Sequence, residues 1–164
     1  MVKELIKTIE KSKLFDEIAM TEVSQDINYE KIQIQIAEVL GMEKKNDSLQ
    51  GRAMQLLQRL SKGKRVLIVL DDVWDILDFE CIGLPNLEHD KHCKILFTSR
   101  EESVCQNMGC KVNFQVSVLS KDESWYLFRE MVGEIADRPD INPIARDIAN
   151  ECGGLRRYCI MQWA

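Results

Sequence analysis

Long apolar runs are absent from this sequence. The longest extends only from Val66 to Leu70, whereas a membrane-spanning helix needs roughly 20 apolar residues. Charged residues interrupt every apolar pair near the N-terminus, so the sequence lacks the apolar core of a secretory signal peptide. We therefore expect a cytoplasmic protein with no integral membrane segment.

An excess of basic residues is also missing. Lys and Arg total 22 and Asp and Glu total 27, which gives a net charge of −5. Nucleic acids and anionic membranes attract positively charged proteins, so neither is an expected partner. The 164 residues, 45% hydrophobic and 30% charged, have the composition of a soluble globular protein.

The cysteines and histidines do not follow a familiar metal-ligand spacing. Cys81, His89, His92 and Cys93 offer the right ligand chemistry for zinc, but their separations match no common zinc motif. We expect the six cysteines to be buried or reduced thiols and predict no zinc site.

Apolar residues at helical spacing predict six helices. The segment Tyr29–Leu40 also alternates like a strand, but it is long for a strand, and Gly41 is a plausible stop. Ser120 and Glu123 form a capping-box pattern, and Pro143 suits a first helical turn. The predicted helices cover residues 2–9, 29–40, 49–60, 102–108, 121–132 and 141–152.

Four apolar segments read as strands. Val66–Leu70 and Lys94–Ser99 are short runs flanked by breakers, as in strands buried on both faces of a parallel sheet. Phe15–Val23 and Phe114–Val118 complete the set. Because strands alternate with helices, the predicted fold class is α/β with a parallel sheet.

Polar residues follow three of these strands. In open parallel sheets, ligands bind beyond the carboxyl ends of the strands. Ser24 with Gln25, Asp71 with Asp72, and Ser99 with Arg100 would share that edge.

Two adjacent carboxylates after an apolar strand are typical of nucleotide-hydrolysing folds, where one faces Mg²⁺ and the other a water. Asp71 or Asp72 could equally cap the turn after the strand. Arg100 could reach a terminal phosphate, or it could pair in solvent with Glu101 or Glu102. Trp74, Trp125 and Phe128 are expected to pack in the core, as large aromatics usually do.

The sequence resembles the NB-ARC nucleotide-binding domain of plant disease-resistance proteins, specifically the coiled-coil branch. The Val66–Trp74 segment is similar to the family's Walker B block, and Lys94–Arg100 is similar to its sensor strand. The other similar blocks, in the family's order, are Phe15–Gln25, Leu119–Phe128 and the Gly-Leu start at Cys152–Leu155.

This resemblance implies an incomplete P-loop NTPase-like sheet over residues 1–119, the start of a helical ARC subdomain over 120–155, and a non-family tail over 156–164. It implies an ADP/ATP switch in plant defence. Asp71 would face Mg²⁺, Asp72 would orient a water, and Arg100 would sense the terminal phosphate. Gly154 and Leu155 would belong to the nucleotide-binding set.

The family's phosphate loop, G-x-x-x-x-G-K followed by Ser or Thr, does not occur in the sequence. The only Gly-Lys pair, Gly63-Lys64, precedes a strand, with Arg65 at the hydroxyl position and Gln58 at the first glycine. The chain also departs from the family after Leu155, where Arg156 replaces a proline that helps hold the adenine.

The resemblance also implies that the strand before the phosphate loop lies between Val66–Leu70 and Lys94–Ser99. Without it, we expect those two segments to face a gap or to leave backbone groups unpaired.

We therefore expect a fragment of an immune-receptor switch with weak or no binding of ADP or ATP and no enzymatic activity. Two alternatives stay open. One is an interaction or decoy protein that docks on full-length NBS-LRR relatives, and the other is an active ATPase.

Overall fold

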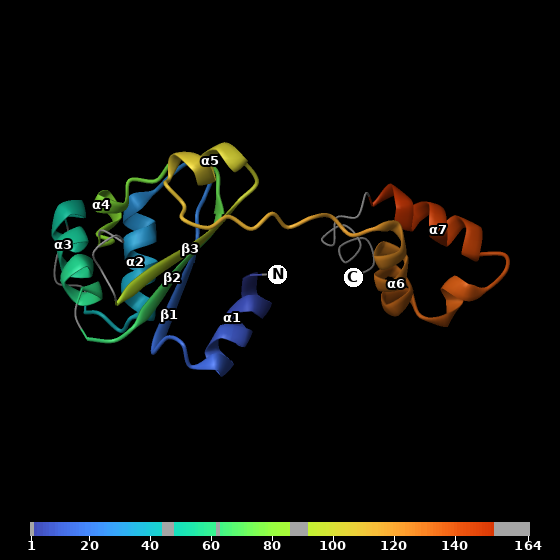
Figure 1. The fold of residues 1–164 in the computed structure, drawn as a ribbon, viewed down its shortest axis with the longest axis horizontal. Helices are drawn as coiled ribbons and strands as arrows, with labels where there is room; N and C mark the ends of the chain where they lie inside the picture. Colours follow the sequence, from blue (N-terminus) through green and yellow to red (C-terminus); the bar gives the residue numbers. More distant parts are fainter. Residues whose placement is uncertain (1, 44–47, 62, 86–91, 153–164) are drawn as a thin grey trace. The chain divides into compact units, whose positions relative to one another are not determined.

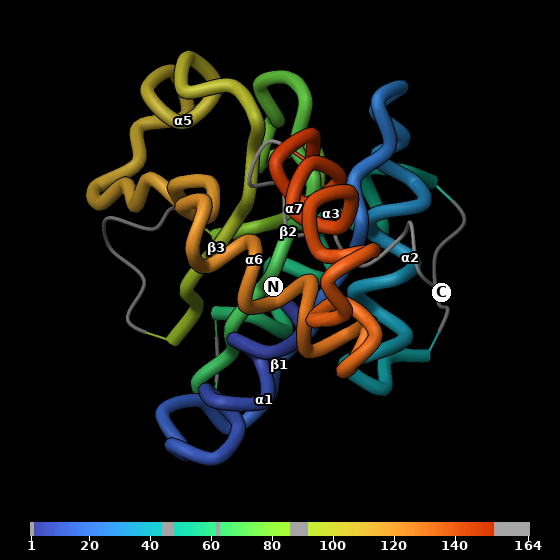
Figure 2. The backbone as a smooth tube through the Cα atoms, turned by 90° about the vertical axis from the view of Figure 1, so that its right-hand side faces the viewer, coloured from blue at the N-terminus to red at the C-terminus, as the bar shows by residue number. Residues whose placement is uncertain are grey.

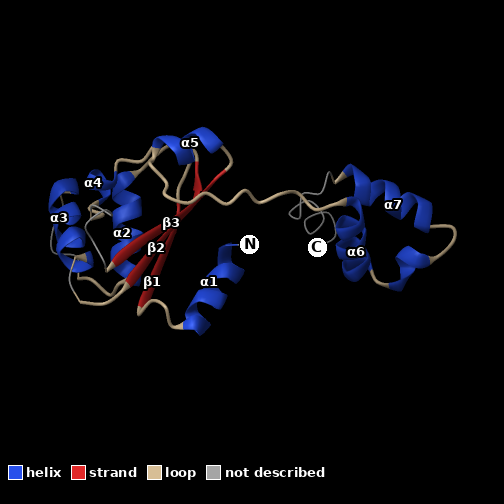
Figure 3. Ribbon diagram, in the orientation of Figure 1, coloured by secondary structure: helices blue, strands red, loops and turns tan. Residues whose placement is uncertain are grey.

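The structure is a computed structural model that describes residues 2–43, 48–61, 63–85 and 92–152. The chain divides into two compact units, residues 1–113 and residues 114–164. The first unit combines a sheet with helices, and the second is helical in its described part (Figure 3).

The first unit alternates helices and strands along the chain (Figure 1). Its elements are α1 (Val2–Ser12), β1 (Glu17–Glu22), α2 (Tyr29–Val39), α3 (Leu49–Leu60), β2 (Val66–Val73), α4 (Phe79–Ile82), β3 (Cys93–Ser99) and α5 (Glu102–Asn107). The predicted parallel α/β class is confirmed, as are the helices predicted in this unit.

The three strands form a parallel sheet in the order β1-β2-β3. In the β1–β2 pair, Glu17 lies opposite Val66 and Glu22 opposite Asp71. In the β2–β3 pair, Val66 lies opposite Cys93. β2 is therefore the central strand.

Both faces of the sheet are covered, which explains the unbroken apolar run in β2. Ile68 and Leu70 pack with residues of α2, α3 and α4 in the main core. Leu67 and Val69 pack with Val2 of α1 on the opposite face. Figure 1 shows α1 and α2 on opposite sides of the sheet, and Figure 2 shows the backbone of the same elements after a quarter turn.

Polar side chains fix the starts of the helices behind the sheet. The Asn28 side chain accepts a hydrogen bond from the Lys31 N–H, and Ser48 accepts one from the Gly51 N–H. These N-caps satisfy backbone donors that have no partner within the helix. They explain why α2 and α3 begin where they do.

The second unit contains α6 (Lys121–Val132), a 3₁₀ turn (Glu134–Asp137) and α7 (Asn142–Glu151). The predicted capping box is confirmed: Ser120 accepts from the Glu123 N–H, and the Glu123 carboxylate accepts from the Ser120 N–H. Phe128 is buried between the helices and stacks on Trp125, with ring centroids 5.9 Å apart. Both aromatics pack as predicted.

Two strand expectations are wrong. β2 and β3 pair directly in parallel, so no gap separates Val66–Leu70 from Lys94–Ser99. Residues 111–120 adopt no regular secondary structure, although Phe114–Val118 alternates as a strand would. Alternation alone does not make a strand, since the backbone groups also need a neighbouring strand to pair with.

Candidate functional site

A β-bulge lies at the carboxyl end of β2. Leu70 lies opposite Phe97 and Val73 opposite Ser99, so Asp71 and Asp72 together face the single residue Thr98. Asp72 has a left-handed backbone with φ of 58°, a region that Asp tolerates better than most residues. Bulges of this kind redirect side chains and are common beside functional sites.

Thr98 connects the two carboxylate residues. Its hydroxyl donates a hydrogen bond to Asp71 Oδ1 at 2.6 Å and accepts one from the Asp72 backbone N–H at 2.9 Å. One β3 side chain therefore satisfies the backbone of the bulge and orients the Asp71 carboxylate.

The Asp72 carboxylate binds two further side chains, those of Arg100 and Trp74. Arg100 Nε donates to Asp72 Oδ1 at 3.1 Å, and Trp74 Nε1 donates to Asp72 Oδ2 at 3.2 Å. The Arg100 guanidinium also lies over the Trp74 ring, 4.8 Å from its centroid. The Arg100 side chain is 58% exposed, so the ion pair with Asp72 is partly solvated and contributes at most about 1 kcal/mol.

The structure brings Asp71, Asp72 and Arg100 to one edge of the sheet. Arg100 pairs with Asp72. The sequence had suggested instead that Arg100 contacts a phosphate or pairs with Glu101 or Glu102. Ser24 donates its hydroxyl to the Asp26 carbonyl, a local turn contact. Gly154 and Leu155 lie outside the described residues.

Sequence analysis missed two residues of this cluster. The apolar pattern identifies Thr98 only as part of a strand, and the usual packing of large aromatics predicts Trp74 in the core. The structure instead places Trp74 against Asp72 and Arg100. Its position directly after a strand ending, among charged residues, was the available signal.

The donor set suits one mode of magnesium binding. Asp71 offers Oδ2, which accepts no hydrogen bond from the described residues. Mg²⁺ is usually held by one or two carboxylates together with phosphate oxygens and waters. Within the described residues no group of three or more His, Cys, Asp or Glu could hold a metal by itself. Asp71 therefore fits a phosphate-bound Mg²⁺, and the described residues offer no all-protein cage there.

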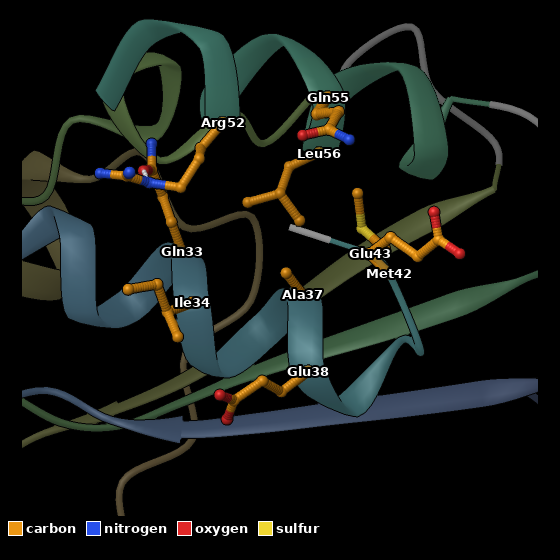
Figure 4. Close-up of a pocket in the computed structure, with 9 residues that line it drawn as sticks. All are labelled: Gln33, Ile34, Ala37, Glu38, Met42, Glu43, Arg52, Gln55 and Leu56. Carbon is orange, nitrogen blue, oxygen red and sulfur yellow. Dashed lines mark hydrogen bonds between the residues drawn. The ribbon is translucent and has the colours of Figure 1, made fainter. Parts of the chain in front are cut away.

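A pocket of about 80 Å³ lies elsewhere, between α2 and α3 (Figure 4). Next to it, the buried Gln33 amide donates to the carbonyls of Leu49 and Cys81 and accepts from Arg52 Nε. Arg52 also pairs with Glu30 at 3.1 Å. Each polar atom of the Gln33 side chain has a protein partner, which identifies this network as a structural link between three helices.

Two of the four residues considered for zinc serve other contacts. The Cys81 thiol donates to the Asp78 carboxylate at 3.1 Å, and this hydrogen bond raises the pKa of Cys81. Cys93 is buried in the core, and His89 lies outside the described residues. None of the helices in the described part of the chain is both long and apolar enough to span a bilayer.

Comparison with known proteins gives the same family as the motifs. The NB-ARC domain family matches residues 1–138. Two Arabidopsis thaliana proteins named as probable disease resistance proteins are 37% and 41% identical to this chain over 134 and 138 residues. The Arabidopsis disease resistance protein UNI is 36% identical over 148 residues.

These alignments cover 81%, 81% and 86% of this chain, but only 15%, 16% and 16% of the relatives. The chain thus spans about a sixth of the length of the relatives it matches. The family match, by contrast, covers most of the chain and includes β2, β3 and the residues at their carboxyl ends. The resemblance is confirmed: the chain belongs to the NB-ARC domain family found in plant disease resistance proteins.

Proposed function

We propose that residues 1–113 carry the magnesium-facing and terminal-phosphate-facing side of an ADP/ATP site in a cytoplasmic plant defence switch. The observation that supports this most strongly is the bulge that sets Asp71 and Asp72 opposite Thr98 and beside Arg100. The names of the relatives as disease resistance proteins support the defence role.

Each residue has a distinct part in the proposal. Asp71, oriented by Thr98, holds Mg²⁺, which neutralises phosphate charge when it is bound. Asp72 positions a water. Arg100 exchanges its Asp72 partner for a terminal phosphate oxygen, because guanidinium groups match phosphate oxygens well.

The proposed affinity of the 164-residue chain is weak. The sequence contains no G-x-x-x-x-G-K-Ser/Thr motif, whose backbone amides and lysine would surround the phosphates. Each hydrogen bond to a charged group contributes about 1.5–3 kcal/mol. Losing three removes at least about 4.5 kcal/mol, roughly a thousandfold in affinity. We therefore propose millimolar binding and no useful ATP hydrolysis.

Titration with Mg²⁺ and ADP or ATP, followed by amide chemical shifts, tests the site at such affinities. We expect shifts at Asp72, Thr98 and Arg100 that depend on Mg²⁺. Asp71→Asn should remove the Mg²⁺ dependence, whereas Asp75→Asn, an exposed carboxylate nearby, should leave it unchanged. Shifts that do not depend on Mg²⁺ would contradict the assignment of Asp71. A micromolar Kd would contradict the proposed weakness.

ATP hydrolysis is tested separately. We expect the wild-type chain and Asp72→Ala to release phosphate at the same background rate. Hydrolysis by the wild-type chain that Asp72→Ala abolishes would show an active ATPase and overturn this part of the proposal.

A second candidate function is docking on full-length relatives. β3 has a strand neighbour only on its β2 side within the described residues. In addition, Val112, Phe114, Val116 and Val118 are all more than half exposed, and Phe114 is 86% exposed. Unpaired strand edges and exposed apolar segments are common sites for added strands.

Co-purification with a full-length relative tests this candidate. We expect Phe114→Ser to weaken capture, and Tyr126→Ser, at another exposed aromatic on α6, to leave it unchanged. Equal capture of both variants, or no capture of the wild-type chain, would exclude the segment around Phe114 as the docking site.

A further inference from the structure

The end of helix α5 has a specific capping geometry. Gly109, with φ of 66°, donates from its N–H to the Gln106 carbonyl at 3.1 Å. The Cys110 N–H donates to the Cys105 carbonyl at 3.3 Å. Together, a left-handed glycine and these two bonds define a Schellman motif, in which the residues at the Cys105 and Cys110 positions bring their side chains together.

Two cysteines occupy the positions that this motif brings together. The backbone hydrogen bond from Cys110 to Cys105 sets the two side chains next to each other on one turn. Both side chains are only half-buried, whereas Cys93 and Cys152 are buried. Val104 and Met108 pack against the main core and anchor the helix. The thiol pair is therefore accessible to small reagents and is held on a fixed turn of backbone.

We propose that Cys105 and Cys110 are a redox-sensitive modification site that forms a reversible intramolecular disulfide by exchange with a small disulfide such as oxidised glutathione. The Cys105 thiolate attacks one sulfur of the small disulfide, forms a mixed disulfide and expels one glutathione thiolate. Cys110 then loses its proton and attacks Cys105 Sγ, which expels the second glutathione thiolate. The two cysteines are oxidised, one glutathione disulfide is reduced to two thiols, and the protons pass to solvent and the leaving thiolates.

The order of attack follows from the environment of Cys110. Burial and the adjacent Cys105 thiol raise the pKa of Cys110. Since the thiolate is the attacking species, Cys110 suits the second, intramolecular step, in which its proximity to Cys105 compensates for its raised pKa.

The fold should favour formation of the Cys105–Cys110 disulfide. In the native chain the Schellman motif holds the thiols together, whereas denaturation releases them. We expect the equilibrium constant for disulfide formation with glutathione to be at least about tenfold larger in the native chain than in urea, equivalent to about 1.4 kcal/mol.

The experiment equilibrates the wild-type chain in glutathione buffers, with and without urea, then alkylates the remaining thiols and maps the peptides by mass spectrometry. We expect a Cys105–Cys110 bond in the native chain. Cys110→Ser and Cys105→Ala should each abolish it. Cys81→Ser, which removes another half-buried thiol, should leave it unchanged.

Two results would overturn the proposal. One is an equal or smaller equilibrium constant in the native chain than in urea, which would show that the fold does not favour the bond. The other is a native disulfide that joins either residue to a different cysteine. Both readouts come from the wild-type chain, so they do not depend on the variants folding.

Discussion

The Thr98 hydroxyl donates a hydrogen bond to the Asp71 carboxylate at 2.6 Å. The same oxygen accepts a hydrogen bond from the Asp72 N–H, so one β3 side chain holds both residues of the β2 bulge. Thr98 therefore orients the Asp71 carboxylate and fixes the Asp72 backbone, although it carries no charge.

Replacing Thr98 with valine should destabilise the fold by about 1–3 kcal/mol, since it leaves the part-buried Asp72 N–H without its acceptor. Chemical denaturation measures this change. Thr98→Ser keeps the hydroxyl and should recover most of the stability. If serine and valine destabilise the fold equally, the hydroxyl is not what stabilises the bulge.

Gly83 should not tolerate a side chain. It ends α4 with φ of 89°, and a Cβ there would lie 2.2 Å from the Ala53 carbonyl oxygen of α3. Gly83→Ala should cost more than about 3 kcal/mol, because backbone strain and a clash with main-chain atoms both contribute.

Gly109→Ala is the matched control for Gly83→Ala. Gly109 has φ of 66°, but nothing lies within 4 Å of the position that an added Cβ would occupy. Gly109→Ala should therefore lower the free energy of unfolding by only about 1 kcal/mol, because backbone strain alone contributes. Equal losses in urea denaturation would show that α3 and α4 move apart readily.

Gln33→Met should destabilise the packing of α2 on α3 and α4. The buried amide has three partners, so the apolar replacement leaves two carbonyls and Arg52 Nε without it. We expect a loss of about 3 kcal/mol in denaturation experiments. Gln58→Met, on the exposed face of α3, should change stability by less than about 0.5 kcal/mol.

The Asp16–Arg65 pair should make stability depend on pH in the acid range. Arg65 donates from its backbone N–H and its side chain to the Asp16 carboxylate, and these hydrogen bonds lower the pKa of Asp16 from 3.8 to about 2. Because the folded pKa is the lower one, the pair stabilises the fold fully above pH 3.8. That contribution is lost as the pH falls towards 2.

Denaturation of the wild-type chain and Asp16→Asn at several pH values measures this dependence. The stability difference between them should be largest near pH 5 and should shrink towards pH 2. Asp26→Asn, another exposed carboxylate, is the control. A difference that stays constant with pH would exclude the ion pair as its cause.

Local sequence was enough to predict most of the elements. The capping box at Ser120 and Glu123 fixed the start of α6, because it satisfies backbone donors within a few residues. The apolar run of β2 predicted a strand buried on both faces, which the packing of α1 and α2 confirms. These features depend on neighbours in sequence or on simple periodicity.

Contacts between distant residues were not predictable in the same way. The sequence predicts Trp74 in the core because large aromatics usually pack there, but the structure gives it a polar partner in Asp72 and a cation in Arg100. The segment Phe114–Val118 has the alternation of a strand without adopting one. In both cases the outcome depends on which partners the fold brings within reach.

By itself, the sequence determined the family and the α/β class. It also determined that Asp71, Asp72 and Arg100 lie at one edge of the sheet, because parallel strands end on the same side. Only the tertiary structure decided that β2 pairs directly with β3 and that a bulge places two carboxylates opposite Thr98. It also decided that Arg100 pairs with Asp72. Strand neighbours and bulges are set by hydrogen bonds between segments far apart in the chain, and no local pattern encodes those bonds.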